Sequence, residues 1–158
     1  MKLILIRHAK SSWEYDLMDH DRPLSTRGIN DAQLVFNPNH FFLAEPYDIL
    51  ASSSKRTRQT AKIFCSLNNI NVEDVIFTNN LYTFDSIQLE KIIKNNSKGN
   101  LIIFGHNNAI TDFVNKFGNY YIENVPTCGV VMLKFDELNT FSPKKGVIIK
   151  TIFPRDLK

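Results

Sequence analysis

The chain has 158 residues, 43% of them apolar, and a net charge of +3, which fits one globular domain over residues 1–158. The net positive charge is small and the lysines and arginines form no run, so we do not expect a nucleic-acid partner. The apolar stretch Lys2–Ile6 is too short for a signal peptide or a membrane span. Cys65 and Cys128 form no CxxC motif, and we expect them to be buried in a cytoplasmic protein without membrane contact.

Short apolar runs alternate with longer amphipathic stretches, which is the pattern of strands joined by crossover helices. The pattern predicts an α/β fold, a three-layer α/β/α sandwich whose mostly parallel sheet has an antiparallel edge. The last two strands should pair as a hairpin through the turn region Asn139–Gly146. The predicted strands are Leu3–Ile6, Asp48–Ala51, Val75–Thr78, Leu101–Gly105, Val130–Phe135 and Val147–Phe153, and helices are predicted over Ser53–Asn68, Ser86–Asn95 and Ala109–Phe117.

A further helix should begin near Arg27, because Ser25 and Thr26 are good N-cap residues. Pro38 falls within the apolar stretch that follows, and a proline inside a helix costs about 3 kcal/mol. We therefore expect the helix to break there, with His40–Ala44 as a separate turn.

Three of the predicted strands end in polar residues suited to binding phosphate. The carboxyl ends of parallel strands lie on one edge of a sheet, so residues distant in sequence can meet there. We expect Arg7, His8, Arg56 and His106 to do so. Two guanidinium groups, two imidazoles and nearby helix N-termini would bind a tetrahedral dianion.

Such a pocket can transfer a phosphoryl group, because its cations neutralise charge on the equatorial oxygens. A neutral histidine is nucleophilic, and Arg7 and Arg56 should disfavour protonation of His8. His8 would attack phosphorus, His106 would donate a hydrogen bond to a phosphoryl oxygen, and water would hydrolyse the phosphohistidine.

Four motifs follow one another along the chain, and a fifth segment extends the pattern over nearly its whole length. They are Leu5–Trp13, Asp19–Ser25 with Arg27, Gly28, Asp31 and Ala32, then Ser52–Ser54 with Arg56–Ala61, Gly105–Asn107, and finally Pro126–Gly129. In these motifs and their order the chain resembles the histidine phosphatase superfamily, with its phosphoglycerate mutase-like fold, and within it the small SixA-like phosphohistidine phosphatases.

The resemblance implies that His8 is phosphorylated, that Arg7, Arg56 and His106 bind the phosphoryl group, and that Arg22 is a further anion ligand. It implies no cofactor and no metal. We expect a monomer acting on a phosphorylated protein of the phosphotransfer type. The alternative substrate is a small phosphate ester.

Two positions depart from the family pattern. Ala9 stands where the superfamily usually has glycine, which would cost about 1 kcal/mol only if the backbone had a positive φ there. Larger relatives place an acidic glutamate after the third strand, whereas here only Asp85 could replace it. Imidazole leaves from phosphohistidine more readily than an alkoxide leaves from an ester, so the missing acid favours a P–N bond.

Other interpretations stay open for several residues. Arg58 could replace Arg56, although the family pattern selects Arg56, and Arg22 could simply pair with Asp19 or Asp21 at the surface. His106 could cap the helix that follows it. His20 and His40 are interpreted as surface or turn residues, and Trp13 and Tyr15 either cover the site or pack beside it.

Two other classes of function compete with a phosphatase. A metallohydrolase would use His8, His20 and His106, but no close pair of histidines supplies ligand spacing and the arginines would repel a cation. A binding module for phosphorylated ligands would have lost the chemistry, which the intact His8 argues against. A mutase is disfavoured because the chain has no large insertion.

Overall fold

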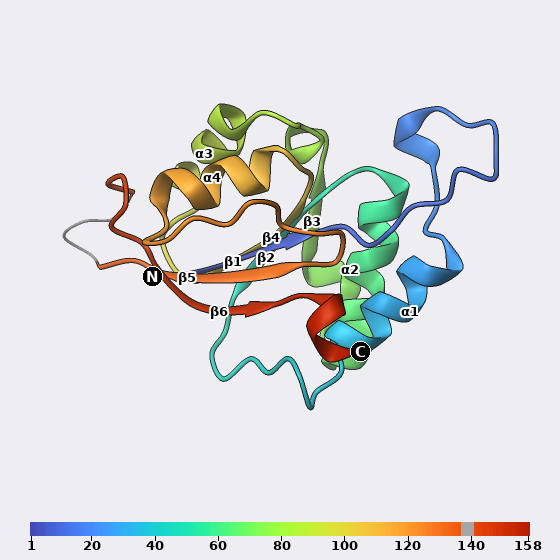
Figure 1. The fold of residues 1–158 in the computed structure, drawn as a ribbon, viewed down its shortest axis with the longest axis horizontal. Coiled ribbons are helices and arrows are strands. Elements are labelled where there is room, and N and C mark those ends of the chain that lie inside the picture. The colour runs from blue at the N-terminus through green and yellow to red at the C-terminus, as the bar shows by residue number, and fades with distance from the viewer. Residues whose placement is uncertain (137–140) are drawn as a thin grey trace.

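A six-stranded sheet lies at the centre of the computed structural model, which describes residues 1–136 and 141–158 (Figure 1). The strand order is β3-β2-β4-β1-β5-β6. The strands are β1 (Lys2–Arg7), β2 (Asp48–Ser52), β3 (Val75–Thr78), β4 (Leu101–Gly105), β5 (Val130–Lys134) and β6 (Val147–Ile152), and the α-helices are α1 (Thr26–Val35), α2 (Lys55–Leu67), α3 (Ser86–Asn95) and α4 (Ala109–Phe117).

The sheet is parallel on one side and antiparallel on the other. β1, β4, β2 and β3 run parallel, while β5 pairs antiparallel with both β1 and β6. This arrangement confirms the predicted α/β class and its antiparallel edge. The predicted turn region Asn139–Gly146 lies partly outside the described residues, since the structure describes it only from Phe141 onward.

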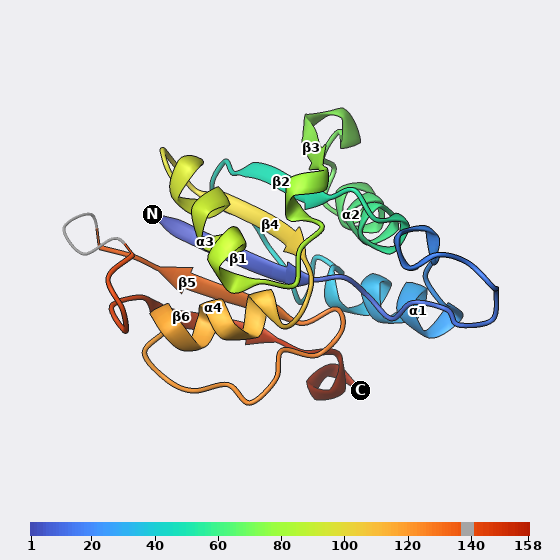
Figure 2. The same ribbon diagram turned by 90° about the horizontal axis from the view of Figure 1, so that it is seen from above.

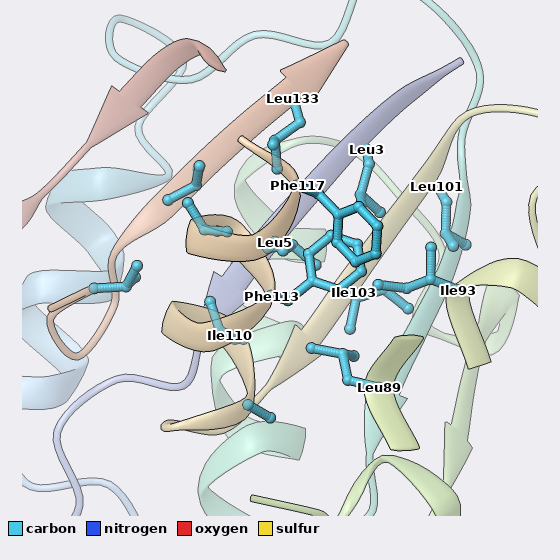
Figure 3. Packing of buried hydrophobic residues seen from close by; sticks show 14 of the residues in the cluster. Leu3, Leu5, Leu89, Ile93, Leu101, Ile103, Ile110, Phe113, Phe117 and Leu133 are labelled. Carbon is cyan, nitrogen blue, oxygen red and sulfur yellow. The ribbon is translucent and has the colours of Figure 1, made fainter. Parts of the chain in front are cut away.

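Helices cover both faces of the sheet (Figures 1 and 2). α3 and α4 lie on one face, where Leu89, Ile110, Phe113 and Phe117 join Leu3 and other strand residues in a buried cluster (Figure 3). Each buried side chain of this size contributes about 1.5–3 kcal/mol of transfer free energy. The burial of β1 and β4 between two layers explains the continuous apolar runs Leu3–Ile6 and Leu101–Phe104 within them.

α1 and α2 cover the other face, and a cluster of phenylalanines packs beneath them. The rings of Phe36, Phe41, Phe64 and Phe104 meet edge to face with centroids 5.3–6.3 Å apart. Two free cysteines, Cys65 and Cys128, are buried and belong to this same layer, as expected.

The sequence located most elements but misplaced some of their ends. α1 ends at Val35, before Pro38, as predicted. The predicted turn at His40–Ala44 is wrong: the carbonyl of Asn37 accepts from the N–H groups of His40 and Phe41, so the turn comes earlier. Within the described parts of the chain, no helix combines the length and apolar character needed to cross a membrane.

Candidate active site

The ends of three neighbouring strands bring the predicted residues together. β4 lies between β1 and β2, so the residues that follow β1 and β4 are adjacent to the last residue of β2. The N–H of His8 donates to the carbonyl of Gly105 at 3.1 Å, which ties the two loops together. The rings of His8 and His106 lie with their centroids 5.1 Å apart.

His8 is buried, with only 8% of its surface exposed, and both ring nitrogens have partners. Nδ1 lies 2.7 Å from the carbonyl oxygen of Ala9, which can only accept, so Nδ1 carries the proton. Nε2 therefore has the lone pair, and it accepts from Nε of Arg56 at 3.2 Å. Ala9 is not among the described residues with a positive φ, so the change from glycine carries no backbone strain.

Arg56 lies in the first turn of α2, with 2% of its surface exposed. α2 begins at Lys55, because Ser54 is its N-cap and accepts from the N–H of Thr57. The predicted start at Ser53 is therefore wrong by two residues. Arg58 points elsewhere: its Nε donates to the carbonyl of Ser53, and its guanidinium lies over the ring of Phe77.

His106 is fixed from the side of β2. Its Nε2 lies 2.8 Å from Oγ of Ser52, and its Nδ1 lies 3.5 Å from Nη2 of Arg56. The side chain does not cap α4, since Oδ1 of Asn107 accepts from the N–H of Thr111. Its imidazole is therefore available at the strand edge beside His8.

Burial and nearby charge keep both imidazoles neutral. Burial, helped by the charges of Arg56, Arg7 and Arg22, outweighs the hydrogen bond to Ala9 and lowers the pKa of His8 to about 3. Burial lowers the pKa of His106 to about 2, with further contributions from His8 and Arg56. A neutral His8 with a free lone pair on Nε2 is a nucleophile at neutral pH.

Two more arginines lie in or beside this region with unused donors. Nη1 of Arg7 donates to the carbonyl of Val125 at 2.9 Å, and burial lowers the pKa of Arg7, with Arg56 adding to the effect. Nε of Arg7 and Nε of Arg22 are buried and have no hydrogen-bond partner among the described residues. Buried donors of this kind are suited to an anionic ligand.

Arg22 pairs with Asp19, as the alternative held, but its side chain is buried rather than at the surface. Its Nη1 donates to Oγ of Ser11, and its Nη2 lies 3.0 Å from Oδ1 of Asp19. The exposed ring of Trp13 covers the guanidinium, whose Cζ lies 3.6 Å from the ring centroid.

Three site residues were missed by sequence reasoning. Asp19 pairs with both Arg22 and Arg56, and the rings of Tyr82 and Phe84 lie 5.4 and 5.2 Å from the ring of His106. The position of Asp19 three residues before Arg22 was the one available signal.

Asp85, the possible acid, is the N-cap of α3, where its Oδ1 accepts from the N–H of Ile87. His20 is only half exposed, and its Nε2 lies 2.9 Å from Oγ of Ser53. It lies in the short helical turn Asp19–Asp21, as the prediction of a surface or turn residue allowed, and is partly buried there.

Outside the histidine and arginine cluster, the features of interest are groups of metal ligands and cavities. Among the described residues, no three His, Cys, Asp or Glu side chains are grouped as a metal ion would require. A cavity of about 460 Å³, lined by Phe41, Tyr47, Leu67 and others, lies at the start of β2 and shares no residue with the histidine and arginine cluster.

Comparison with known sequences assigns the first half of the chain to a family. Residues 3–79 match the histidine phosphatase superfamily (branch 1). An uncharacterised chloroplastic protein of Arabidopsis thaliana is 48% identical over 62 residues, which is 39% of this chain and 28% of that protein. The chain thus matches less than a third of that relative's length.

Comparison with solved structures extends over the whole chain. The protein histidine phosphatase SixA complexed with tungstate has a TM-score of 0.79 at 17% identity, with 100% of both chains covered. The alpha-ribazole phosphatase from Shigella flexneri has a TM-score of 0.65 at 17% identity, with 94% of both chains covered. These likenesses show a shared phosphoglycerate mutase-like fold, as predicted.

Proposed function

Because residues 3–79 match the histidine phosphatase superfamily, we propose that the chain is a phosphatase that carries the phosphoryl group on Nε2 of His8. The observation that carries this proposal is the state of the His8 ring. The carbonyl of Ala9 holds the proton on Nδ1, and Nε of Arg56 points at the lone pair of Nε2. Both contacts leave Nε2 as the nucleophilic atom.

The first step would be an in-line displacement at phosphorus. A bond forms between Nε2 and phosphorus as the bond to the leaving group breaks, and the leaving group takes that electron pair. For this bond to form, the Nε–H of Arg56 turns from Nε2 to a phosphoryl oxygen, which frees the lone pair. The guanidinium groups of Arg7 and Arg22 and Nδ1 of His106 would stabilise the remaining oxygens.

His106 can donate to the phosphoryl group because Ser52 can change roles. Oγ of Ser52 is both donor and acceptor, and when it donates to Nε2 of His106 the proton of the ring is on Nδ1. In the second step water attacks phosphorus as the bond to His8 breaks, and the electron pair of that bond returns to Nε2. Inorganic phosphate then leaves with the oxygen and both protons of the water.

For the substrate we propose phosphohistidine on a protein, such as a phosphotransfer protein, in the cytoplasm. In the described parts of the chain, the one carboxylate in hydrogen-bond contact with this cluster is Asp19. Burial would raise its pKa, but hydrogen bonds from Tyr82, Arg22 and Arg56 outweigh that effect and keep the pKa well below the usual range. A neutral acid is thus not available, and the imidazole of phosphohistidine needs one least. The SixA structure supports this choice, whereas the alpha-ribazole phosphatase favours a small ester as the second candidate.

The test compares substrates and traps the intermediate. A phosphohistidine protein, a phosphoserine peptide and p-nitrophenyl phosphate are assayed with the wild-type protein and His8→Ala. We expect the phosphohistidine protein to have the highest kcat/KM, His8→Ala to be inactive, and an acid-labile phosphoenzyme to form only on the wild type. Faster turnover of the phosphoserine peptide would overturn the substrate, and no phosphoenzyme on His8 would overturn the mechanism. A chelator should leave the activity unchanged.

A further inference from the structure

The carboxylate of Asp19 lies between two arginines of the candidate site. Asp19 begins the short helix η1 (Asp19–Asp21). Its Oδ1 lies 3.0 Å from Nη2 of Arg22, and its Oδ2 lies 2.9 Å from Nη2 of Arg56. The hydroxyl of Tyr82 also donates to Oδ2. Two oxygens joined to one carbon thus make the contacts that two oxygens of a phosphoryl group would make.

Each nitrogen of the Arg56 guanidinium already has a partner. Nε donates to His8, Nη1 donates to the backbone carbonyl of Asp19 at 2.6 Å, and Nη2 is bound to the carboxylate and lies 3.5 Å from Nδ1 of His106. Nη1 of Arg22 is likewise bound to Ser11. A phosphoryl group placed between the two Nη2 atoms would therefore compete with the carboxylate for the N–H groups that the carboxylate now occupies.

We propose that Asp19 is an internal competitor that occupies the phosphoryl-binding donors of Arg22 and Arg56 and so sets the affinity of the site for phosphate. This inference rests on the proposed function, because it assigns the pocket to a phosphoryl group. Asp19 is then a specificity-determining residue: it weakens the binding of any free tetrahedral oxyanion, including the product, inorganic phosphate. A protein substrate can offset the competition with contacts outside the pocket.

The carboxylate has room to leave. The side chain of Asp19 is 45% exposed, whereas those of Arg22 and Arg56 are 8% and 2% exposed. Figures 1 and 2 show the segment between β1 and α1, which carries Asp19, reaching out beyond the sheet. The backbone carbonyl of Asp19 holds Nη1 of Arg56, and Ser11 holds Arg22, so both arginines stay in place when the carboxylate turns away.

The size of the effect follows from the population of the open state. The apparent dissociation constant of a ligand equals its intrinsic value divided by the fraction of protein able to bind it. If the carboxylate occupies the arginines in about nine molecules of ten, removing it lowers the apparent Kd about tenfold.

The experiment measures the binding of inorganic phosphate and tungstate by calorimetry, without turnover. The variants are Asp19→Asn, which keeps the shape and the backbone carbonyl, and Asp19→Ala. Asp21→Asn is the matched control, because Asp21 lies in the same turn and its Oδ1 lies 3.5 Å from Nδ1 of His20 rather than beside an arginine of the site. We expect both Asp19 variants to bind the oxyanions about tenfold more tightly than wild type, and the control to bind as wild type does.

A Kd that is unchanged or higher in folded Asp19→Asn would overturn the proposal, since Asp19 would then serve to orient Arg56. Loss of the folded state in both variants, seen by circular dichroism, would also overturn it, because a contact that the ligand replaces cannot be what holds the fold. The phosphoenzyme assay with His8 tests the proposed function separately. Tighter oxyanion binding without phosphoenzyme would refute that function and leave the competition standing.

Discussion

Nε of Arg56 lies 3.2 Å from Nε2 of His8, and Nη2 of the same guanidinium lies 3.5 Å from Nδ1 of His106. One buried cation therefore touches both imidazoles. Its charge lowers the pKa of each histidine, and its planar donors fix the direction of both rings. The first turn of α2 places this group beside both rings, and Ser54 caps the helix just before it.

Replacing Arg56 by lysine should reduce catalysis strongly although the charge is retained. An ammonium group cannot contact His8, His106 and the phosphoryl group at once, since it lacks the planar fork of the guanidinium. We expect kcat/KM to fall by a factor of about 10²–10³, the usual effect of losing one oxyanion donor. Steady-state kinetics would measure this loss, with the substrate that has the highest kcat/KM in the comparison of phosphohistidine, phosphoserine and p-nitrophenyl phosphate.

Arg58→Lys is the matched control, because Arg58 lies in the same helix turn and contacts Ser53 and Phe77 instead. Its kcat/KM should stay within about threefold of wild type. Equal losses in the two variants would mean that the contact between Arg56 and His8 has no special role.

The core of the fold could be predicted because its strands are apolar throughout. Leu101–Gly105 is buried along its whole length, and Val75–Thr78 and Ala109–Phe117 have the predicted bounds. The turn after α1 was misplaced because the carbonyl of Asn37, rather than the proline next to it, organises the chain there. Hydrogen bonds of a single backbone carbonyl leave no periodic signal in a sequence.

The site was predictable where its residues directly follow strands. His8 and His106 come after β1 and β4, so the topology of a parallel sheet already brings them to one edge. Asp19 and Tyr82 lie on connecting segments 63 residues apart, and only the folded chain brings the hydroxyl of one to the carboxylate of the other. Asp85 was a candidate acid by sequence position, yet the backbone N–H of Ile87 binds its carboxylate.

The two neutral histidines should make the protein less stable in mild acid. The folded-state pKa of His8 is about 3 and that of His106 about 2, whereas in the unfolded chain both are near 6.5. Below about pH 6.5 the unfolded chain binds protons that the folded one does not. The two neutral histidines therefore leave the free energy of unfolding undiminished above that pH. As the pH drops below it, the free energy of unfolding falls by up to about 1.4 kcal/mol per pH unit for each histidine.

Urea unfolding at pH 7, 6 and 5 would measure this slope, in a window where few carboxylates titrate. His8→Asn removes one of the two groups, so its free energy of unfolding should fall about half as steeply between pH 6 and 5. An identical slope in wild type and variant would show that His8 is protonated in the folded state.

The last prediction concerns Gly28, which lets α1 pack against the loop that follows His8. A Cβ atom at this position would lie 2.1 Å from the carbonyl oxygen of Lys10. That same oxygen accepts from the N–H of Ser25 at 2.9 Å, so the clash would separate the helix N-terminus from the loop. We expect Gly28→Ala to lower the free energy of unfolding by about 2 kcal/mol or more and to reduce activity, because Lys10 lies two residues from the nucleophile.

Gly99→Ala is the control for this variant, since a Cβ atom there has no neighbour within 4 Å. Its free energy of unfolding should stay within about 0.5 kcal/mol of wild type. Thermal and urea unfolding of both variants, together with their kcat/KM, would decide the matter. If Gly28→Ala were as stable and active as Gly99→Ala, the close approach of α1 to the loop would not be what positions His8, and the family-like pair of Arg27 and Gly28 would need another explanation.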